Sequence, residues 1–176
     1  RGLGDVYKRQ GKVIAGKPDA PLAKVGNTRK KGTLVRFLPD DAIFEDVRFN
    51  YDTVFRRLQE LAYLNRGLKI VFLDERVSDP ARRETTFHYE GGIIDYVRYL
   101  NDGKTVLHDQ PIYLEGQKDS VICRVAIQYT DGYTESLFSY VNNIPTGEGG
   151  THETGFKAAF TKMFNDYARR NGFLKE

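Results

Sequence analysis

A glycine-rich tract directly before a patterned helix constrains the fold of this chain most strongly. The tract reads "NNIPTGEGGTHET", from Asn142 to Thr154, and the residues after it recur at helical spacing: Phe156, Ala159, Phe160, Met163, Phe164 and Tyr167. Glycine adopts positive φ at little cost, so the tract predicts a tight strand-to-helix connection. Gly172 can end the helix, and three side chains are alternative caps for its start: Thr151, Glu153 and Thr154. We expect the apolar stripe to pack inside a domain.

The first half of the chain predicts a strand, a helix and two further strands. Alternation in "GTLVRFLPD" favours a short strand over Leu34–Phe37, closed by Pro39. Asn50 can cap the helix that follows and Gly67 can end it, and its apolar residues are Tyr51, Val54, Phe55, Leu58, Leu61 and Ala62. The run "LKIVFLD" is apolar at nearly every position and predicts a buried strand, and "TTFHYE" predicts another.

The second half of the chain reads as a second unit. It starts at Gly91-Gly92 and begins with a helix, ended by Gly103, whose apolar face is Ile93, Ile94, Val97 and Leu100. A strand follows, with one face formed by Val121, Cys123, Val125, Ile127 and Tyr129. Asp131-Gly132 predicts a hairpin turn, because both central residues of such a turn need positive φ. The sequence therefore indicates an α+β class.

Composition limits the function only broadly. The chain has 176 residues, 40% of them hydrophobic, and a net charge of +3, which permits contact with nucleic acid without arguing for it. No apolar run approaches the ~18 residues of a membrane span, so we expect no membrane contact. Cys123 is the single cysteine, which fits a reducing compartment and an expected cytoplasmic location. Within its alternating strand, Cys123 is expected to be a small core residue.

The residues show no complete catalytic or metal-binding motif. A phosphate-binding loop needs Gly-Lys-Ser/Thr after its first glycine and four residues, but Phe156 follows Gly155 in the glycine-rich tract. Three histidines lie far apart and lack metal-ligand spacing, so we assign no metal site: His88, His108 and His152. "NTRKK", from Asn27 to Lys31, is usually a solvated basic loop and less often an anion contact.

Several long motifs resemble a known family. "NNIPTGEGGTHETGFKAAFTKMFNDYA" is similar to the signature of the ATPase subunits of bacterial type II topoisomerases, and three more motifs match in the same order: "GKPDAPLAKVGNTRKKGTLVRFLPDDAIF", "LQELAYLNRGLKIVFLDER" and "FHYEGGIIDYVRYLN". The resemblance covers residues 16 to 176. Two branches are alternatives, the DNA gyrase B branch, which "ELAYLNRGL" favours, and the topoisomerase IV branch. A non-enzymatic binding module that reuses the fold is a further alternative.

The resemblance implies a layout of two incomplete domains. Residues 1–90 would be the C-terminal part of a GHKL-type ATPase domain, an α/β sandwich, and residues 91–176 a transducer domain with a βαβ fold like that of a ribosomal protein. The opening "RGLGDVYKRQ", residues 1–10, departs from the family pattern, and we place no function there. We read the chain as a fragment, with the family's catalytic glutamate and Mg²⁺-holding asparagine upstream and its phosphate-contacting lysine downstream.

The resemblance also implies site residues, cofactors and partners. Thr33 matches a threonine that helps hold adenine through water, and Gly32 matches the glycine before it. A transducer relay loop would comprise Gly147, Gly149, Gly150, Thr151 and His152. The full-length parent would use ATP and Mg²⁺ to drive negative supercoiling, with DNA, a gyrase A subunit in an A2B2 heterotetramer, and a second B subunit as partners. No catalytic residue lies in this chain, so alone it should be inactive.

Overall fold

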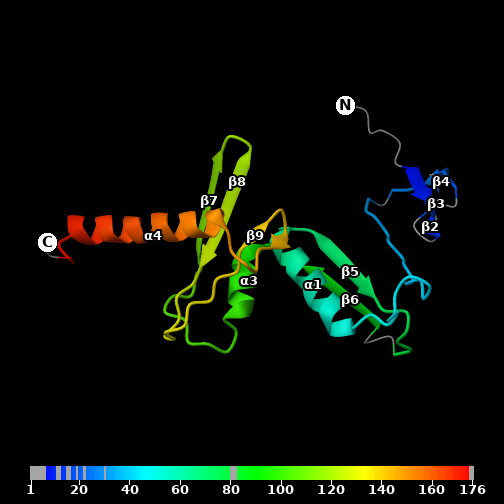
Figure 1. Ribbon diagram of the computed structural model, residues 1–176, viewed down its shortest axis with the longest axis horizontal. Helices are drawn as coiled ribbons and strands as arrows, with labels where there is room; N and C mark the ends of the chain where they lie inside the picture. Colours follow the sequence, from blue (N-terminus) through cyan, green and yellow to red (C-terminus); the bar gives the residue numbers. More distant parts are fainter. Residues whose placement is uncertain are drawn as a thin grey trace. The chain divides into compact units, whose positions relative to one another are not determined.

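The structure is a computed structural model that describes residues 7–10, 13–14, 17–18, 20–21, 23–29, 31–79 and 83–174. It divides into two compact units, unit 1 at residues 1–50 and unit 2 at residues 51–176. Helices and antiparallel strands both occur in the described part of the chain (Figure 1), which confirms the predicted α+β class. Among these residues, no helix is both long and apolar enough to cross a membrane.

Unit 1 contains two short antiparallel pairs of strands. Strand β1 (Tyr7–Gln10) pairs with β4 (Ala23–Asn27), and the register shifts between Lys8 and Arg9. Strand β2 (Val13–Ile14) pairs with β3 (Lys17–Pro18). Thus β1 lies within the opening stretch to which we gave no function.

The prediction of a strand over Leu34–Phe37 is wrong. Residues 31–39 form no helix or strand, and the side chains of Leu34 and Phe37 are 93% and 65% exposed. Phe37 meets the ring of Phe49 edge-on at 5.2 Å. Alternation gives a segment one apolar face, but a strand also needs a second backbone for its hydrogen bonds. Among the described residues, no strand pairs with this segment.

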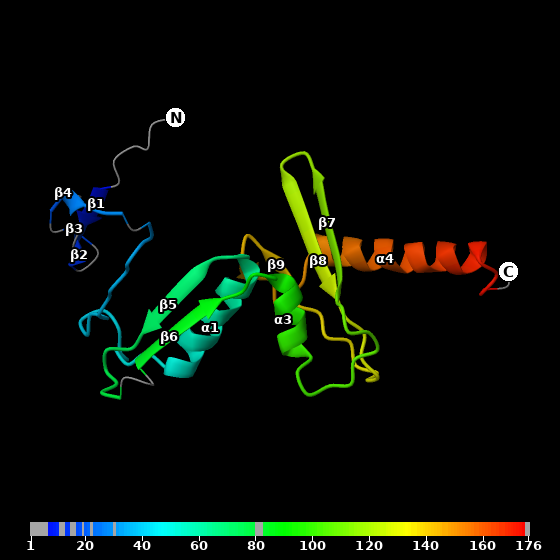
Figure 2. The same ribbon diagram turned by 180° about the vertical axis from the view of Figure 1, so that it is seen from behind.

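Unit 2 opens with a helix that packs on a two-stranded sheet. Helix α1 (Tyr51–Leu64) is the predicted helix, and Gly67 in the turn after it has φ of +75°. Strand β5 (Lys69–Leu73) pairs antiparallel with β6 (Glu84–His88), and α1 lies along this pair in both views (Figures 1 and 2). The buried apolar residues of the described chain lie here: Ala62, Tyr63 and Phe87.

Strand β5 is less buried than its composition predicts. Ile70 and Phe72 are half-buried, whereas Val71 and Leu73 on the other face are 52% and 45% exposed. Successive side chains of a strand point to opposite faces, and α1 packs against this sheet. The apolar run therefore predicted the strand correctly. The prediction that both faces of this strand are buried is wrong, because only one face is covered.

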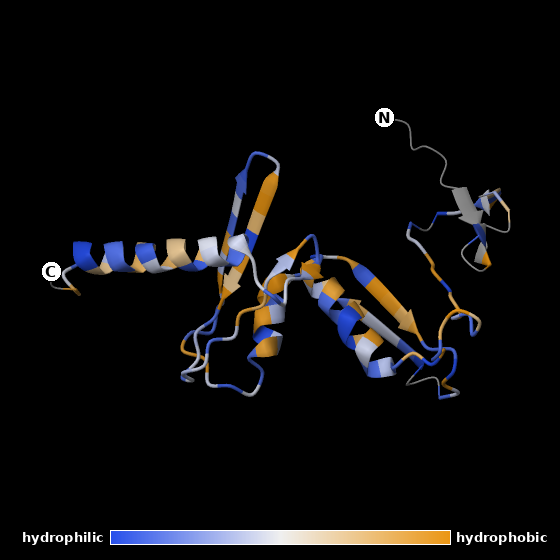
Figure 3. Ribbon diagram, in the orientation of Figure 1, coloured by the Kyte–Doolittle hydropathy of each residue, from blue (hydrophilic) through white to orange (hydrophobic). Residues whose placement is uncertain are grey.

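The helix predicted after Gly91-Gly92 is confirmed as α3 (Ile93–Leu100). Gly92 is its N-cap with φ of +61°, and Gly103 in the turn beyond it has φ of +77°. Strand β7 (Ile112–Lys118) then pairs antiparallel with β8 (Val121–Ile127). Figure 3 shows that β8 is largely hydrophobic.

Cys123 is exposed, so its predicted place in a core is wrong. The end of β8 near Ile127 is half-buried, but the end near the β7–β8 turn is exposed on both faces. Helix α3 contacts β8, and a helix of eight residues covers only part of such a hairpin. The alternation in the sequence predicted the strand correctly, but it could not show how much of β8 is covered by α3.

The prediction of a hairpin turn at Asp131-Gly132 is also wrong. These residues form a bend in which Asp131 N–H donates to Thr105 O at 3.1 Å. The tight hairpin lies further on, where β9 (Tyr140–Val141) pairs with β10 (Ile144–Pro145). Asn142 and Asn143 between them have φ of +50° and +66°. Asparagine tolerates positive φ better than most residues, so this pair supplies the turn that Asp-Gly did not.

The last helix, α4 (Thr151–Arg170), is the predicted one, and Gly172 with φ of +72° follows its end. No residue of α4 is buried, and Met163, Phe164 and Tyr167 are 49%, 45% and 58% exposed. The expected packing of the stripe inside a domain is therefore not seen. Instead its rings contact each other one helical turn apart: Phe156 with Phe160 at 5.3 Å, and Phe160 with Phe164 at 4.8 Å.

Candidate functional site

The predicted nucleotide-contacting residues lie in the irregular part of unit 1. Gly32 has φ of +151°, and Thr33 beside it is exposed. The hydroxyl of Thr33 can both donate and accept a hydrogen bond, so it can contact a base, a phosphate oxygen or an ordered water. The two residues alone do not make a nucleotide site.

The predicted relay loop lies in unit 2, where Gly147, Gly149 and Gly150 come between β10 and α4, and Thr151 and His152 are the first two residues of α4. Gly149 has φ of +74°, and its N–H donates to Thr146 O at 2.8 Å. Gly150 is the N-cap of α4 with an extended backbone, and no side chain caps the helix there. Thr151, Glu153 and Thr154 were the alternatives for this cap, and none of them holds it. Glu153 N–H instead donates to Gly150 O at 3.1 Å.

A chain of side-chain hydrogen bonds connects the relay loop to Ser139, the residue before β9. The hydroxyls of Ser139 and Thr146 lie 2.5 Å apart, and Ser139 Oγ donates to Glu153 Oε2 at 3.2 Å. His152 Nε2 lies 3.1 Å from Thr146 Oγ1. A Cβ at Gly150 would lie 2.8 Å from the His152 ring, so a larger residue there would displace the ring. The loop is therefore held by specific contacts rather than left as an open turn.

Lys157 in the second turn of α4 pairs with two carboxylates. Lys157 Nζ lies 2.8 Å from Glu135 Oε1 and 3.5 Å from Glu153 Oε1. The hydrogen bond to Glu135 raises the pKa of Lys157 above its usual value, with Glu153 adding to the effect. Glu153 thus contacts Ser139 through Oε2 and Lys157 through Oε1.

The β9–β10 hairpin contacts helix α1 through polar side chains. Arg57 Nη2 donates to Asn143 O at 2.8 Å, and Asn143 Nδ2 donates to Asn65 Oδ1 at 3.0 Å. The hydroxyl of Tyr140 donates to Glu60 Oε1 at 2.5 Å. We call this set of five residues the α1–hairpin contact. Its partners are about 80 residues apart in sequence, so no local pattern could have predicted it.

A row of stacked tyrosines lies beside the α1–hairpin contact. The ring of Tyr63 on α1 stacks on Tyr89 at 3.6 Å and on Tyr96 of α3 at 4.9 Å. Tyr96 OH also lies 3.3 Å from Tyr140 OH and 3.5 Å from Glu60 Oε1. Burial is the main cause that raises the pKa of Tyr63 and of Tyr96, so both phenols stay protonated at neutral pH. The stack joins α1 and α3 through flat, uncharged surfaces.

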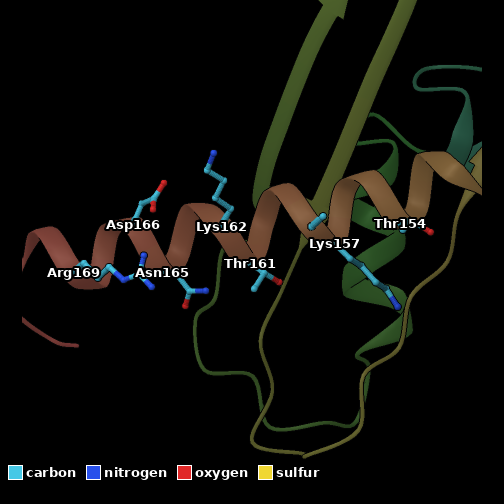
Figure 4. Close-up of a pocket in the computed structure, with 8 residues that line it drawn as sticks. Thr154, Lys157, Thr161, Lys162, Asn165, Asp166 and Arg169 are labelled. Atoms are coloured by element: carbon cyan, nitrogen blue, oxygen red, sulfur yellow. The ribbon is translucent and has the colours of Figure 1, made fainter. Parts of the chain in front are cut away.

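A shallow hollow on α4 does not form an enclosed site. Its lining residues all come from this one helix (Figure 4): Thr154, Lys157, Ala158, Thr161, Lys162, Asn165, Asp166 and Arg169. A ligand pocket normally surrounds most of its ligand, and one helix cannot do so. Lys157 in the hollow is already paired with two carboxylates.

The three histidines serve separate local contacts. His88 Nε2 pairs with Glu90 Oε1 at 2.8 Å. His108 Nε2 accepts the N–H of Tyr129 at 3.0 Å, and its Nδ1 lies 2.7 Å from Gln110 O. Because Nε2 is an acceptor, Nδ1 carries the proton and donates to that carbonyl. His152 lies in the relay loop and contacts Thr146.

This chain is similar to known proteins in three respects: it matches a family model, it shares sequence identity with relatives, and it shares its fold with solved structures. The family model described as DNA gyrase B matches residues 92–176. The DNA gyrase B protein of Clostridium acetobutylicum is 49% identical over 162 residues, which cover 92% of this chain and 25% of that relative. The DNA gyrase B protein of Bacillus mycoides is 46% identical over 166 residues, covering 94% of this chain and 40% of that relative. The chain therefore spans only a quarter to two fifths of these relatives.

Two solved structures have the same fold. The 43K ATPase domain of Thermus thermophilus gyrase B, solved in complex with an aminocoumarin, is 32% identical with a TM-score of 0.76, over 97% of this chain and 46% of that one. The gyrase B protein of Myxococcus xanthus is 28% identical with a TM-score of 0.70, over 86% of this chain and 44% of that one. The topoisomerase IV alternative is not favoured by these matches. By its motifs, its relatives and its fold, this chain belongs to the DNA gyrase B family.

Proposed function

We propose that this chain is part of a gyrase B protein that couples ATP binding and hydrolysis to DNA strand passage and negative supercoiling. The observation that carries the proposal is the 49% identity to a DNA gyrase B protein over 92% of the chain. Within the whole protein, this stretch would join an ATPase domain to a transducer domain. The partners would be DNA, the gyrase A subunit in an A2B2 heterotetramer, and a second B subunit. The location would be cytoplasmic.

The proposed domain boundary lies near residue 91. Residues 1–90 would belong to the GHKL-type ATPase domain and residues 91–176 to the transducer domain. The match to the family model begins at Gly92, a glycine with positive φ, which supports this position. The compact units divide elsewhere, at Asn50, so that α1, β5 and β6 lie in one unit with the proposed transducer residues. Contact between α1 and the proposed transducer is what a coupling element requires.

The proposed cofactors are ATP and Mg²⁺, which supply the phosphoryl group and the charge neutralisation of hydrolysis. Gly32 and Thr33 are the proposed nucleotide-contacting residues. The Thr33 hydroxyl would hydrogen-bond the base through water, and Gly32 would let the backbone turn toward it. We propose no catalytic group and no metal ligand within this chain, because phosphoryl transfer needs a positioned base and metal ligands that these two residues cannot provide.

The proposed role of the relay loop is mechanical. Gly147, Gly149, Gly150, Thr151 and His152 connect the β9–β10 hairpin to the start of α4. Hydrogen bonds hold the loop to Ser139 and Thr146, and the hairpin is held to α1. A displacement of α1 would therefore reach α4 through defined contacts, which supports a relay rather than a phosphate-binding role.

DNA-stimulated ATP turnover tests this proposal. The full-length protein, assembled with its gyrase A partner, should hydrolyse ATP in the presence of Mg²⁺, and DNA should stimulate the rate. The 176-residue chain alone should show no turnover above a Gly32→Ala/Thr33→Ala control. Turnover by the chain alone would contradict the assignment of its residues. A full-length protein with no ATP turnover would favour the alternative of a non-enzymatic binding module.

A further inference from the structure

The carboxylate of Glu60 is the point where three elements of unit 2 meet. Its Oε1 accepts the hydroxyl of Tyr140 from β9 at 2.5 Å and lies 3.5 Å from the hydroxyl of Tyr96 on α3. Its Oε2 pairs with Arg57, one turn earlier on α1. Arg57 in turn donates to the carbonyl of Asn143 at the tip of the hairpin. One acidic side chain on α1 therefore orients both a helix and a hairpin.

Tyr140 is a proton donor in this contact at neutral pH. Burial, followed by the hydrogen bond to Glu60, raises the pKa of the Tyr140 phenol well above its usual value. The phenol of Tyr140 therefore keeps its proton at neutral pH and donates it in a hydrogen bond to the Glu60 carboxylate. Hydrogen bonds to a charged group are stronger than those between neutral groups. The contact is both directional and strong.

The contact is continuous with the relay loop. Ser139 directly precedes Tyr140, and its carbonyl accepts the N–H of Thr146 at 2.9 Å. Its hydroxyl reaches Glu153 in the first turn of α4. Only one peptide bond separates the residue held by α1 from the residue that holds α4.

We propose that Glu60 and Tyr140 are positioning residues that hold the relay loop in register with α1. A displacement of α1 moves Tyr140, Ser139 follows through the backbone, and the start of α4 follows through Ser139 and Glu153. This inference rests on the proposed function for its role in turnover. The physical link itself rests on the contacts alone.

The test uses the full-length protein with its gyrase A partner and compares Tyr140→Phe with a matched control. Tyr113→Phe removes the same hydroxyl from a similar bond, 2.6 Å to Glu115 Oε2 within β7, and Tyr113 belongs to neither the α1–hairpin contact nor the relay loop. Tyr140→Phe should raise amide hydrogen exchange in residues 142–150 several-fold and lower the DNA stimulation of ATP turnover about tenfold. Nucleotide affinity should stay unchanged. Tyr113→Phe should match the wild type throughout.

A second variant separates positioning from general stability. Glu60→Gln keeps the shape of the side chain and removes its charge, so Glu60→Gln and Tyr140→Phe together should have no more effect than the stronger single change. Additive effects would overturn the proposal. So would wild-type exchange and wild-type DNA stimulation in Tyr140→Phe. If Tyr140→Phe lost nucleotide affinity, thermal stability and the DNA stimulation of ATP turnover to the same extent, its role would be merely structural. That result would also overturn the proposal.

Failure of the proposed function has a different signature. If the wild-type enzyme shows no DNA-stimulated turnover, the proposed function fails and the role in turnover fails with it. Hydrogen exchange then still decides the link between Glu60 and Tyr140, because it needs neither ATP nor DNA.

Discussion

The hydroxyl of Ser139 donates a hydrogen bond of 3.2 Å to Oε2 of Glu153 and so joins the residue before β9 to the first turn of α4. Gly149 lies in the loop that this bond closes, with φ of +74° and its N–H bonded to Thr146 O. The loop is short and tied at both ends. Its backbone conformation therefore determines where α4 begins relative to the hairpin.

Gly149→Ala should impair coupling more than it impairs folding. Alanine at this φ costs on the order of 1 kcal/mol of backbone strain, because its Cβ disfavours positive φ, although the Cβ itself would make only an ordinary contact of 3.4 Å with Glu153 Oε2. In the full-length enzyme, we expect nucleotide binding to be retained while DNA-stimulated ATP turnover and supercoiling fall together. Parallel measurements of nucleotide affinity, turnover and supercoiling check this.

Gly147→Ala is the matched control for that change. Gly147 lies in the same loop without positive φ, and a Cβ there would meet nothing within 4 Å. It should behave as the wild type. Supercoiling by Gly149→Ala at the wild-type rate, or unfolding of the variant at ordinary temperature, would remove the support for a relay role.

Phe160→Ala should cost this chain only about 1–2 kcal/mol of unfolding free energy. Full burial of the ring would make the loss about 3–5 kcal/mol, but Phe160 is half-buried and contacts the rings of Phe156 and Phe164. Denaturant unfolding of the chain measures the difference, with the exposed neighbour Thr161→Ala as control. A loss of about 3–5 kcal/mol would mean, by the same principle, that the stripe is covered after all.

Thr33→Ala should weaken nucleotide binding by the full-length protein about fivefold. The change removes one hydrogen bond to a neutral group, which is worth on the order of 1 kcal/mol. Thr33→Ser keeps the hydroxyl and should restore the affinity. Calorimetric titration with a non-hydrolysable ATP analogue measures both variants. Equal affinity in wild type and Thr33→Ala, with both proteins folded, would assign Thr33 a purely local role in the backbone.

Asp74→Asn should lower the unfolding free energy at neutral pH and have little effect in acid. Asp74 is 6% exposed and accepts hydrogen bonds from Arg76, which lower the pKa of its carboxyl although burial opposes them. The folded pKa therefore lies below the unfolded value of about 4. The stabilisation is complete above that value and is lost as the pH falls through the folded pKa.

Unfolding of wild type and Asp74→Asn from about pH 7 down to about pH 2 measures this convergence. The exposed Asp102→Asn is the control, and its curve should follow the wild type across the range. A difference between wild type and Asp74→Asn that stays constant below about pH 4 would show that the carboxylate acts through packing and not through its charge.

The sequence predicts the helices of unit 2 well because their signals are local. Apolar residues at helical spacing identify α1, α3 and α4, and Gly67, Gly103 and Gly172 adopt the positive φ expected beyond the helix ends. The apolar run of β5 and the alternation of β8 likewise identify strands. Each of these predictions depends only on residues a few positions apart.

The errors arise where the outcome depends on distant partners. Leu34–Phe37 has the pattern of a strand but no described strand beside it, and Cys123 has a core-like pattern at the uncovered end of a hairpin. The link between Glu60 and Tyr140 crosses 80 residues and has no local signal. The turn at Asn142-Asn143 did have one, because two consecutive asparagines between β-branched and aromatic residues favour a hairpin with positive φ.

Supercoiling of relaxed circular DNA tests the central claim most directly. The full-length protein that contains this chain, assembled with its gyrase A partner, is incubated with relaxed plasmid and Mg²⁺, with or without ATP, and the topoisomers are separated on a gel. We predict negative supercoils that form only with ATP. Decatenation or relaxation without any negative supercoiling, at saturating ATP, would contradict the assignment to DNA gyrase.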